Sequence, residues 1–229
     1  MIKSGIDQNA LIEMFSEASA KQSEALRQAV REATLKALQG RELTLANIRN
    51  VLKSVTQAAS VGAAQNPAGV IDIEALLSKA FAGMDAALLQ AVQANRRALQ
   101  QFVDQGADLR EKQLKSALAN VEKMEDVFFA TVSKAAQTAG GPLQAPWEQV
   151  LKTMKLKGTD TGAQATSTVE QLMAQAQTAL RDGRATGMRT AQVMMDSYAA
   201  LVSGVLIGMS EGLQNEATAA PGGGRSHNK

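Results

Sequence analysis

The feature of this sequence that most limits its fold is a long stretch with helical spacing and no proline. Residues 73 to 139 contain no proline, and the whole chain has only four. Because proline breaks a helix interior, such a stretch can continue as one helix. At about 1.5 Å per residue it would extend about 100 Å, a length typical of coiled coils and extended bundles. Its apolar stripe consists of Leu77, Phe81, Met84, Leu88, Val92, Leu99, Phe102, Leu114, Leu118, Val121, Met124, Phe128 and Val132.

This stripe weakens between Phe102 and Leu114, where Gly106 lies among charged residues. A gap of this kind is either a stutter in a coiled coil or a break that folds the stretch into a hairpin. A glycine inside a helix costs only about 1 kcal/mol relative to alanine, so packing can offset it. The sequence therefore leaves residues 72–139 as either one straight helix or a helical hairpin.

Residues 1–66 have the pattern of an N-terminal helical hairpin. Apolar residues spaced three and four apart indicate one amphipathic helix over residues 7–39, with Gly40 as its C-terminal cap. Thr44 is a good N-cap for a second helix, whose apolar face continues to Ala59. Two antiparallel helices joined near Gly40 are the simplest arrangement of this segment.

The C-terminal part has three predicted segments. Residues 140–166 predict a short helix, opened by Pro146, followed by a loop at residues 157–162. Residues 167–214 predict a long C-terminal helix, because their first four residues have capping-box spacing. Residues 215–229 are rich in glycine and nearly free of large apolar side chains, which predicts a disordered tail.

The composition agrees with an all-α fold. Apolar residues make up 45% of the chain and aromatic residues only 3%, a balance that favours close helix packing over a sheet. We therefore predict an elongated bundle of long amphipathic helices with coiled-coil character and a disordered C-terminal tail. The absence of cysteine excludes disulfides and thiolate sites. No apolar secretory signal opens the chain, so we expect a cytoplasmic protein.

The charges argue against a nucleic-acid partner. Lysine and arginine total 24 and aspartate and glutamate total 22, and the two signs are interspersed along the chain. Binding to a phosphate backbone requires a one-sided basic field, which no segment offers.

No pattern predicts catalysis, a cofactor or a metal site. The single histidine, His227, lies in the predicted tail and can belong to no preorganised site. Acidic residues at Asp104 and Asp108 and within residues 122–126 have basic neighbours at helical spacing, which indicates solvated helix faces rather than metal ligands. No phosphate-binding loop or nucleophile motif occurs. We therefore expect that the chain is not an enzyme.

One small surface-docking patch is predicted in the short helix. Trp147, Lys152, Lys155 and Lys157 could together dock on an anionic surface. The alternative is that the three lysines only stabilise the C-terminal end of the helix through its dipole.

Glycines recur at every fourth position at Gly204, Gly208 and Gly212. Charges at Asp196 and Glu211 leave an uncharged stretch shorter than the roughly 20 residues that a membrane span requires, so no transmembrane span is predicted. A row of small residues allows another backbone to approach closely. We interpret this row as a helix-packing seam, either within the chain or between copies in a homo-oligomer.

A family resemblance lies in the stretch Ala87-Leu-Leu-Gln-Ala-Val-Gln-Ala-Asn-Arg-Arg-Ala-Leu-Gln-Gln-Phe102, continued by Val-Asp-Gln-Gly-Ala-Asp-Leu-Arg-Glu-Lys-Gln-Leu114. Its glutamine, asparagine, alanine and leucine, followed by a glycine and a charged helical turn, resemble the phasins, which coat bacterial polyhydroxyalkanoate granules. The resemblance implies a non-enzymatic protein that binds the granule through diffuse apolar faces. The extended last helix and its glycine row depart from the phasin pattern.

These observations leave three functions open. The first is a phasin-like protein that coats a hydrophobic granule surface in the cytoplasm through amphipathic helices. The second is a soluble oligomeric scaffold or interaction module whose apolar stripes are used in packing against helical protein partners. The third is a helical pore-forming protein that hides its apolar segment until it inserts.

Overall fold

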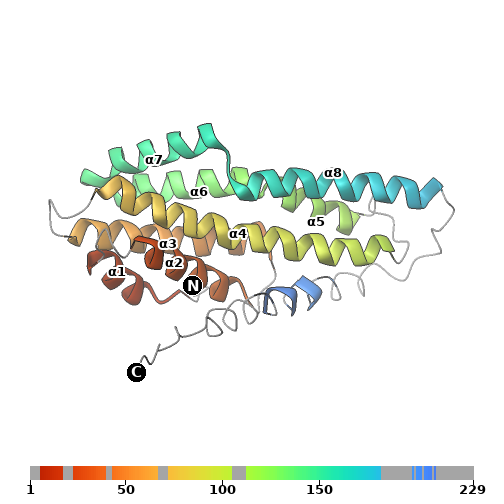
Figure 1. The fold of residues 1–229 in the computed structure, drawn as a ribbon, viewed down its shortest axis with the longest axis horizontal. Coiled ribbons are helices and arrows are strands. Elements are labelled where there is room, and N and C mark those ends of the chain that lie inside the picture. Colours follow the sequence, from red (N-terminus) through yellow and green to blue (C-terminus); the bar gives the residue numbers. More distant parts are fainter. Residues whose placement is uncertain are drawn as a thin grey trace, which may run out of the picture.

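The computed structural model describes residues 6–17, 23–39, 43–66, 72–104 and 112–181, and also residues 198, 200–202, 204–207 and 209. These residues form helices and the short turns between them, with no strand among them. The helices lie side by side in an elongated bundle (Figure 1). The predicted all-α fold is therefore confirmed, whereas the predicted tail lies outside the described residues.

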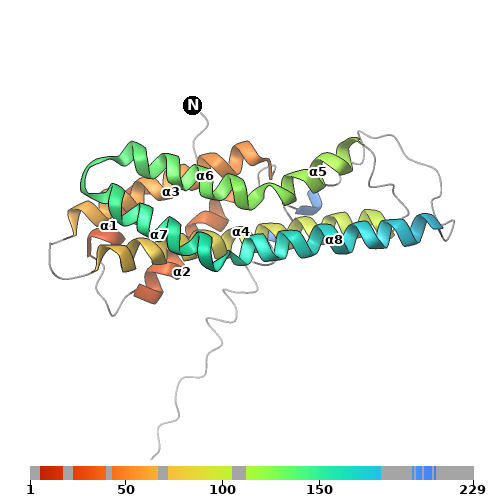
Figure 2. The same cartoon turned by 90° about the horizontal axis from the view of Figure 1, so that it is seen from above.

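The elements follow one another in the order α1 (Gln8–Glu17), α2 (Ser23–Leu38), α3 (Leu45–Gln65), α4 (Ile73–Asp104), α5 (Lys112–Glu122), α6 (Met124–Ala139), the 3₁₀ turn η2 (Gly141–Leu143), α7 (Gln144–Lys157) and α8 (Asp160–Arg181). The described residues between 198 and 209 are also helical. α4 extends along most of the bundle, and α8 follows its second half (Figure 2).

The stretch with no proline is folded back on itself. It contains α4, then α5 and α6, which return along the bundle (Figure 1). Leu99 and Phe102 of α4 share a cluster with Leu114 and Leu118 of α5. Of the two predicted arrangements the structure therefore has the hairpin. The part of the apolar stripe on α4 packs against the part on α5 and α6.

The N-terminal segment differs from the predicted pair of helices. Where one helix was predicted over residues 7–39, the structure has α1 and α2, with residues 18–22 between them outside the described part. No large apolar side chain lies between Phe15 and Leu26, so the stripe has a gap there. Thr44 caps α3 as predicted, since its hydroxyl accepts a hydrogen bond from the Asn47 amide at 3.2 Å.

α1 is parallel to its main partner, α3. Near the start of α1, the Gln8 side chain donates a hydrogen bond to the Ser54 carbonyl at 3.4 Å. Near its end, the Phe15 carbonyl accepts one from the Asn66 side chain at 2.9 Å. Gly62 of α3 faces α1 so closely that a Cβ there would meet its backbone.

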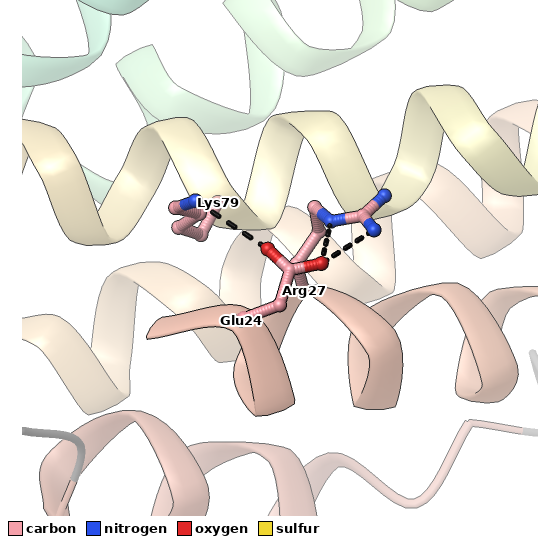
Figure 3. Close-up of polar contacts among 3 residues, drawn as sticks. All are labelled: Glu24, Arg27 and Lys79. Carbon is pink, nitrogen blue, oxygen red and sulfur yellow. Dashed lines mark hydrogen bonds and ion pairs between the residues drawn. The ribbon is translucent and has the colours of Figure 1, made fainter. Parts of the chain in front are cut away.

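α2 is likewise parallel to α4, and the two meet at a surface ion-pair cluster (Figure 3). The Glu24 carboxylate lies 2.5 Å from Arg27 Nη2 on its own helix and 3.6 Å from Lys79 Nζ on α4. The hydrogen bond from Arg27 lowers the pKa of the Glu24 carboxyl. One turn further along, Gly83 of α4 lies directly against Val30 of α2.

The core consists of two clusters that share α4. The first fills one end, between α1, α2, α3, α6, α7 and the first half of α4, and includes stacked Phe81 and Phe128 with ring centroids 4.4 Å apart. The second lies among the second half of α4, α5, α8 and the described residues between 198 and 206. α4 thus connects both ends of the bundle.

α8 begins at Asp160, so the predicted start at Ser167 is wrong and the predicted loop shrinks to Gly158 and Thr159. The helix start is fixed by Thr159, whose hydroxyl accepts a hydrogen bond from the Gly162 amide, and by Asp85 of α4, which accepts hydrogen bonds from the Asp160 and Thr161 amides. α8 is described to Arg181, and most of the remaining predicted helix to residue 214 lies outside the described residues.

Candidate functional site

Trp147 is buried, which corrects its predicted place in a surface-docking patch. Its side chain has no exposed area, and its indole Nε1 donates a hydrogen bond to Ser60 Oγ of α3 at 2.9 Å. Ser60 in turn donates to the Thr56 carbonyl at 2.8 Å. Trp147 lies three and four residues before Val150 and Leu151, so it shares their apolar face. The residue therefore anchors α7 on the core.

The three lysines of the predicted patch remain on the surface at the end of α7. Lys152, Lys155 and Lys157 are all exposed, and Lys155 Nζ lies 5.7 Å from the centre of the Phe129 ring. Between the last two, Leu156 is 82% exposed. The structure thus separates the basic residues from Trp147 and places a different apolar side chain beside them.

The glycine row can be judged at Gly204 alone, because Gly208 and Gly212 lie outside the described residues. A Cβ added at Gly204 would meet no atom within 4 Å. The same helical segment packs on the second cluster through a different face, formed by Tyr198, Val202 and Leu206. The predicted seam within the chain is therefore not found at Gly204, and a seam between copies stays a prediction.

Tyr198 fixes this segment to α4. Its hydroxyl donates a hydrogen bond to Asn95 Oδ1, and the Asn95 amide donates to the Ala91 carbonyl at 2.8 Å. Burial raises the pKa of the Tyr198 phenol. This pair satisfies two polar side chains inside an apolar cluster.

A group of buried and part-buried polar contacts surrounds the start of α8. Asp85 of α4 accepts hydrogen bonds from the backbone amides of Asp160 and Thr161 at 3.0 and 3.1 Å. Thr159 Oγ1 accepts one from the Gly162 amide at 2.9 Å. Its hydroxyl also donates to Glu125 of α6 at 2.5 Å. These contacts join three helices at one point.

The Asp85 carboxyl has little freedom to act as a catalyst. Burial raises its pKa, while the hydrogen bonds from Thr161 and Asp160 oppose that shift. Both carboxylate oxygens are already engaged with the first amides of α8. The arrangement therefore fixes a helix N-terminus, where a negative charge also interacts favourably with the helix dipole.

An open groove lies at the end of the bundle where α3 ends and α6 turns into α7. It has a volume of about 580 Å³, and Ile12 of α1, Val61 of α3 and Pro142 of η2 contribute to its lining. Val61 is 43% exposed. Sequence reasoning missed this apolar groove, because its lining comes from segments far apart in the chain.

A family model described as a family of unknown function, DUF6781, matches residues 1–215. This chain belongs to DUF6781. No curated protein and no solved structure matches it.

Two of the described acidic residues of this DUF6781 protein are engaged with neighbours. Asp104 accepts a hydrogen bond from Gln100 at 2.8 Å, and Glu125 is held by Thr159. In the part of the chain that the structure describes, no three histidines or carboxylates gather as metal ligands. The absence of a cofactor and of catalytic residues stays a prediction.

Among the described helices, α4 has the length and composition of a possible membrane span. Its most apolar 18-residue window has a mean hydropathy of 1.3, and 67% of that window is buried in the bundle. This burial is expected of a core helix, because α4 takes part in both apolar clusters.

Proposed function

We propose that this DUF6781 protein is a non-enzymatic, phasin-like protein that coats a hydrophobic polyester surface. The observation that supports the proposal is that continuous apolar faces hold the amphipathic helices together. An apolar surface offers such faces a similar gain, about 25 cal/mol for each Å² removed from water. Exchanging helix contacts for surface contacts therefore costs little free energy.

The contact between α2 and α4 is the place where such an exchange can begin. Leu26 and Val30 of α2 pack in the first cluster with Ala80 of α4. Among the described residues, the polar contact between these two helices is the ion pair of Glu24 with Lys79. This pair is exposed, so it contributes little to the free energy of unfolding. Within the described part of the chain, separating α2 from α4 therefore breaks no buried hydrogen bond that the structure shows between them.

The apolar groove beside Val61 supplies a first contact in the closed bundle. Its open, mostly apolar lining can touch a hydrophobic surface before any helix moves. Adsorption in this proposal then has two steps, contact at the groove and release of α2.

The test is adsorption of the purified protein to polyhydroxybutyrate particles, measured by sedimentation. Wild type should bind the particles and ignore hydrophilic silica. Gly83→Ala should adsorb faster, because an added Cβ would lie 2.6 Å from the Arg27 carbonyl and loosen α2. The matched control is Gly204→Ala, whose added Cβ would lie in open space.

A second pair of variants tests the groove. Val61→Gln should slow adsorption, whereas Met173→Gln, at a residue of α8 that is 39% exposed and outside the groove, should not. If wild type stays in solution with the particles at low and at high salt, the coat proposal is wrong.

The scaffold function is the second candidate, and one observation favours it. The apolar stripes are already buried between helices, as expected of a self-contained bundle. A protein that ignores the particles but has a defined oligomeric mass in sedimentation velocity would favour the scaffold.

A further inference from the structure

A second groove lies between α3 and α6, next to the apolar one, with which it shares Thr138 at its border. It is open, has a volume of about 340 Å³ and is bordered by three cations: Arg49 and Lys53 of α3 and Lys134 of α6. Arg49 and Lys53 are one helical turn apart, so both reach the same side of α3. Lys134 approaches from the opposite wall.

None of these three cations forms an ion pair with a carboxylate in the described structure. α3 contains no acidic residue along its whole length. On α6 the acidic residues are Glu125 and Asp126 of the first turn, which do not line the groove, and Glu125 is held by Thr159. The cluster in Figure 3 is the contrast, because there one carboxylate serves both Arg27 and Lys79.

The remaining lining suits a small polar anion. Asn50 and Thr131 add a side-chain amide and a hydroxyl, both of which can donate hydrogen bonds to an oxyanion. The small side chains of Ala130 and Ala135 leave the space between the cations open. An arginine fork binds phosphate oxygens through two parallel hydrogen bonds, and a lysine adds a point charge.

We propose that the groove formed by Arg49, Lys53 and Lys134 binds a phosphate group. Three cations concentrated in this small volume match one phosphate rather than a nucleic-acid backbone, which requires a longer basic surface. The phosphate can be free in solution or belong to a lipid headgroup, since both present the same oxygens.

This site is independent of the coat function. Polyester particles carry no phosphate, and phosphate binding requires no release of α2. Failure of one proposal therefore leaves the other intact.

The first experiment is calorimetric titration of the full chain with inorganic phosphate at constant ionic strength. Wild type should bind with a single-site isotherm. Lys53→Gln combined with Lys134→Gln should weaken binding at least about tenfold, because two charge-assisted contacts are lost. Lys36→Gln combined with Lys115→Gln, at exposed lysines of α2 and α5 outside the groove, also loses two charges, so it is the charge-matched control and should bind as wild type does.

Ala130→Leu distinguishes binding of phosphate inside the groove from its general attraction to basic residues on the surface. Ala130 is exposed, so leucine there leaves the core intact while filling the groove, and all three charges remain. This variant should lose phosphate binding at least as fully as the double lysine variant. A circular dichroism melt shows that each variant is folded.

The second experiment is flotation with phosphatidylcholine vesicles with and without phosphatidylglycerol. Groove-dependent binding of the anionic vesicles, without binding of free phosphate, would support the site and assign its phosphate to a lipid. The proposal is overturned if the groove variants match the Lys36→Gln and Lys115→Gln double control in both experiments, or if wild type binds neither probe.

Discussion

Gly62 and Gly83 set the distance between two pairs of parallel helices. A Cβ at Gly83 would lie 2.6 Å from the Arg27 carbonyl and 2.8 Å from Val30 Cβ. At Gly62 the nearest backbone atom would be the Ile12 carbonyl, at 2.5 Å. Because a helix backbone cannot yield as a flexible side chain does, these two positions require glycine for steric reasons.

Gly62→Ala and Gly83→Ala should each lower the free energy of unfolding by about 1–3 kcal/mol, because the added methyl forces two helices apart. Urea unfolding measures the change. Gly204→Ala, in open space on a helix, should instead raise it by up to about 1 kcal/mol through helix propensity. Equal effects in all three variants would contradict the close approach.

Asp85 should make stability depend on pH. Its pKa in the folded state is raised above the ordinary value of 3.8, mainly by burial. A raised pKa contributes stability below the unfolded value that is lost as pH rises through the folded value. Asparagine at this position cannot ionise, so Asp85→Asn does not lose this contribution. The free energy of unfolding of the variant minus that of wild type should therefore increase from about pH 4 to pH 7. Urea unfolding at several pH values would contradict this if both proteins have the same pH slope.

At the scale of elements, local signals were sufficient for some helix starts and insufficient for others. Thr44 was predicted as an N-cap, and its hydroxyl accepts a hydrogen bond from the Asn47 amide in the first turn of α3. The start of α8 has a local N-cap at Thr159 that our prediction passed over, whereas the contribution of Asp85 comes from a distant helix and has no local signal. The burial of Trp147 could have been predicted in place of the surface patch, since its spacing from Val150 and Leu151 places it on the apolar face.

The cationic groove could be predicted only in part. The sequence shows Arg49 and Lys53 one turn apart on a helix without acids. Lys134 is added by the packing of α6 against α3, which no sequence pattern specifies.

The helical segment around Gly204 tests the remaining form of the predicted seam. Tyr198, Val202 and Leu206 face the bundle, while Gly204 faces open space and Ile207 is 43% exposed. If copies pair through this face, Gly204→Leu should reduce the assembly mass in sedimentation velocity without lowering the unfolding temperature. Gly204→Ala keeps the face small and should assemble as wild type does. An unchanged assembly mass in the leucine variant would show that copies do not pair through this face.

At the scale of the whole molecule, the bundle has two cores on one axis. α4 passes through both, and the other helices belong mainly to one end. Leu77 lies in the first cluster and Leu99 in the second, each fully buried. A destabilising substitution in one core should therefore increase local unfolding more at that end of the bundle than at the other end.

Leu77→Ala and Leu99→Ala should each cost about 2–5 kcal/mol of unfolding free energy, because each leaves a cavity. Hydrogen exchange should increase mostly in α1, α3, α6 and α7 for the first variant, and in α5 and α8 for the second. If both variants accelerate exchange in the same helices, the two cores unfold as one unit.

The chain has one tryptophan and one tyrosine, and the fold places them at different ends. Trp147 is enclosed in the first cluster, so its fluorescence will shift to longer wavelength only when that end admits water. Tyr198 is enclosed in the second, so the phenol will ionise at its ordinary pH only after that end has come apart. The protein therefore carries two built-in optical reporters, one for each core, that can show without any label which end separates first on a surface.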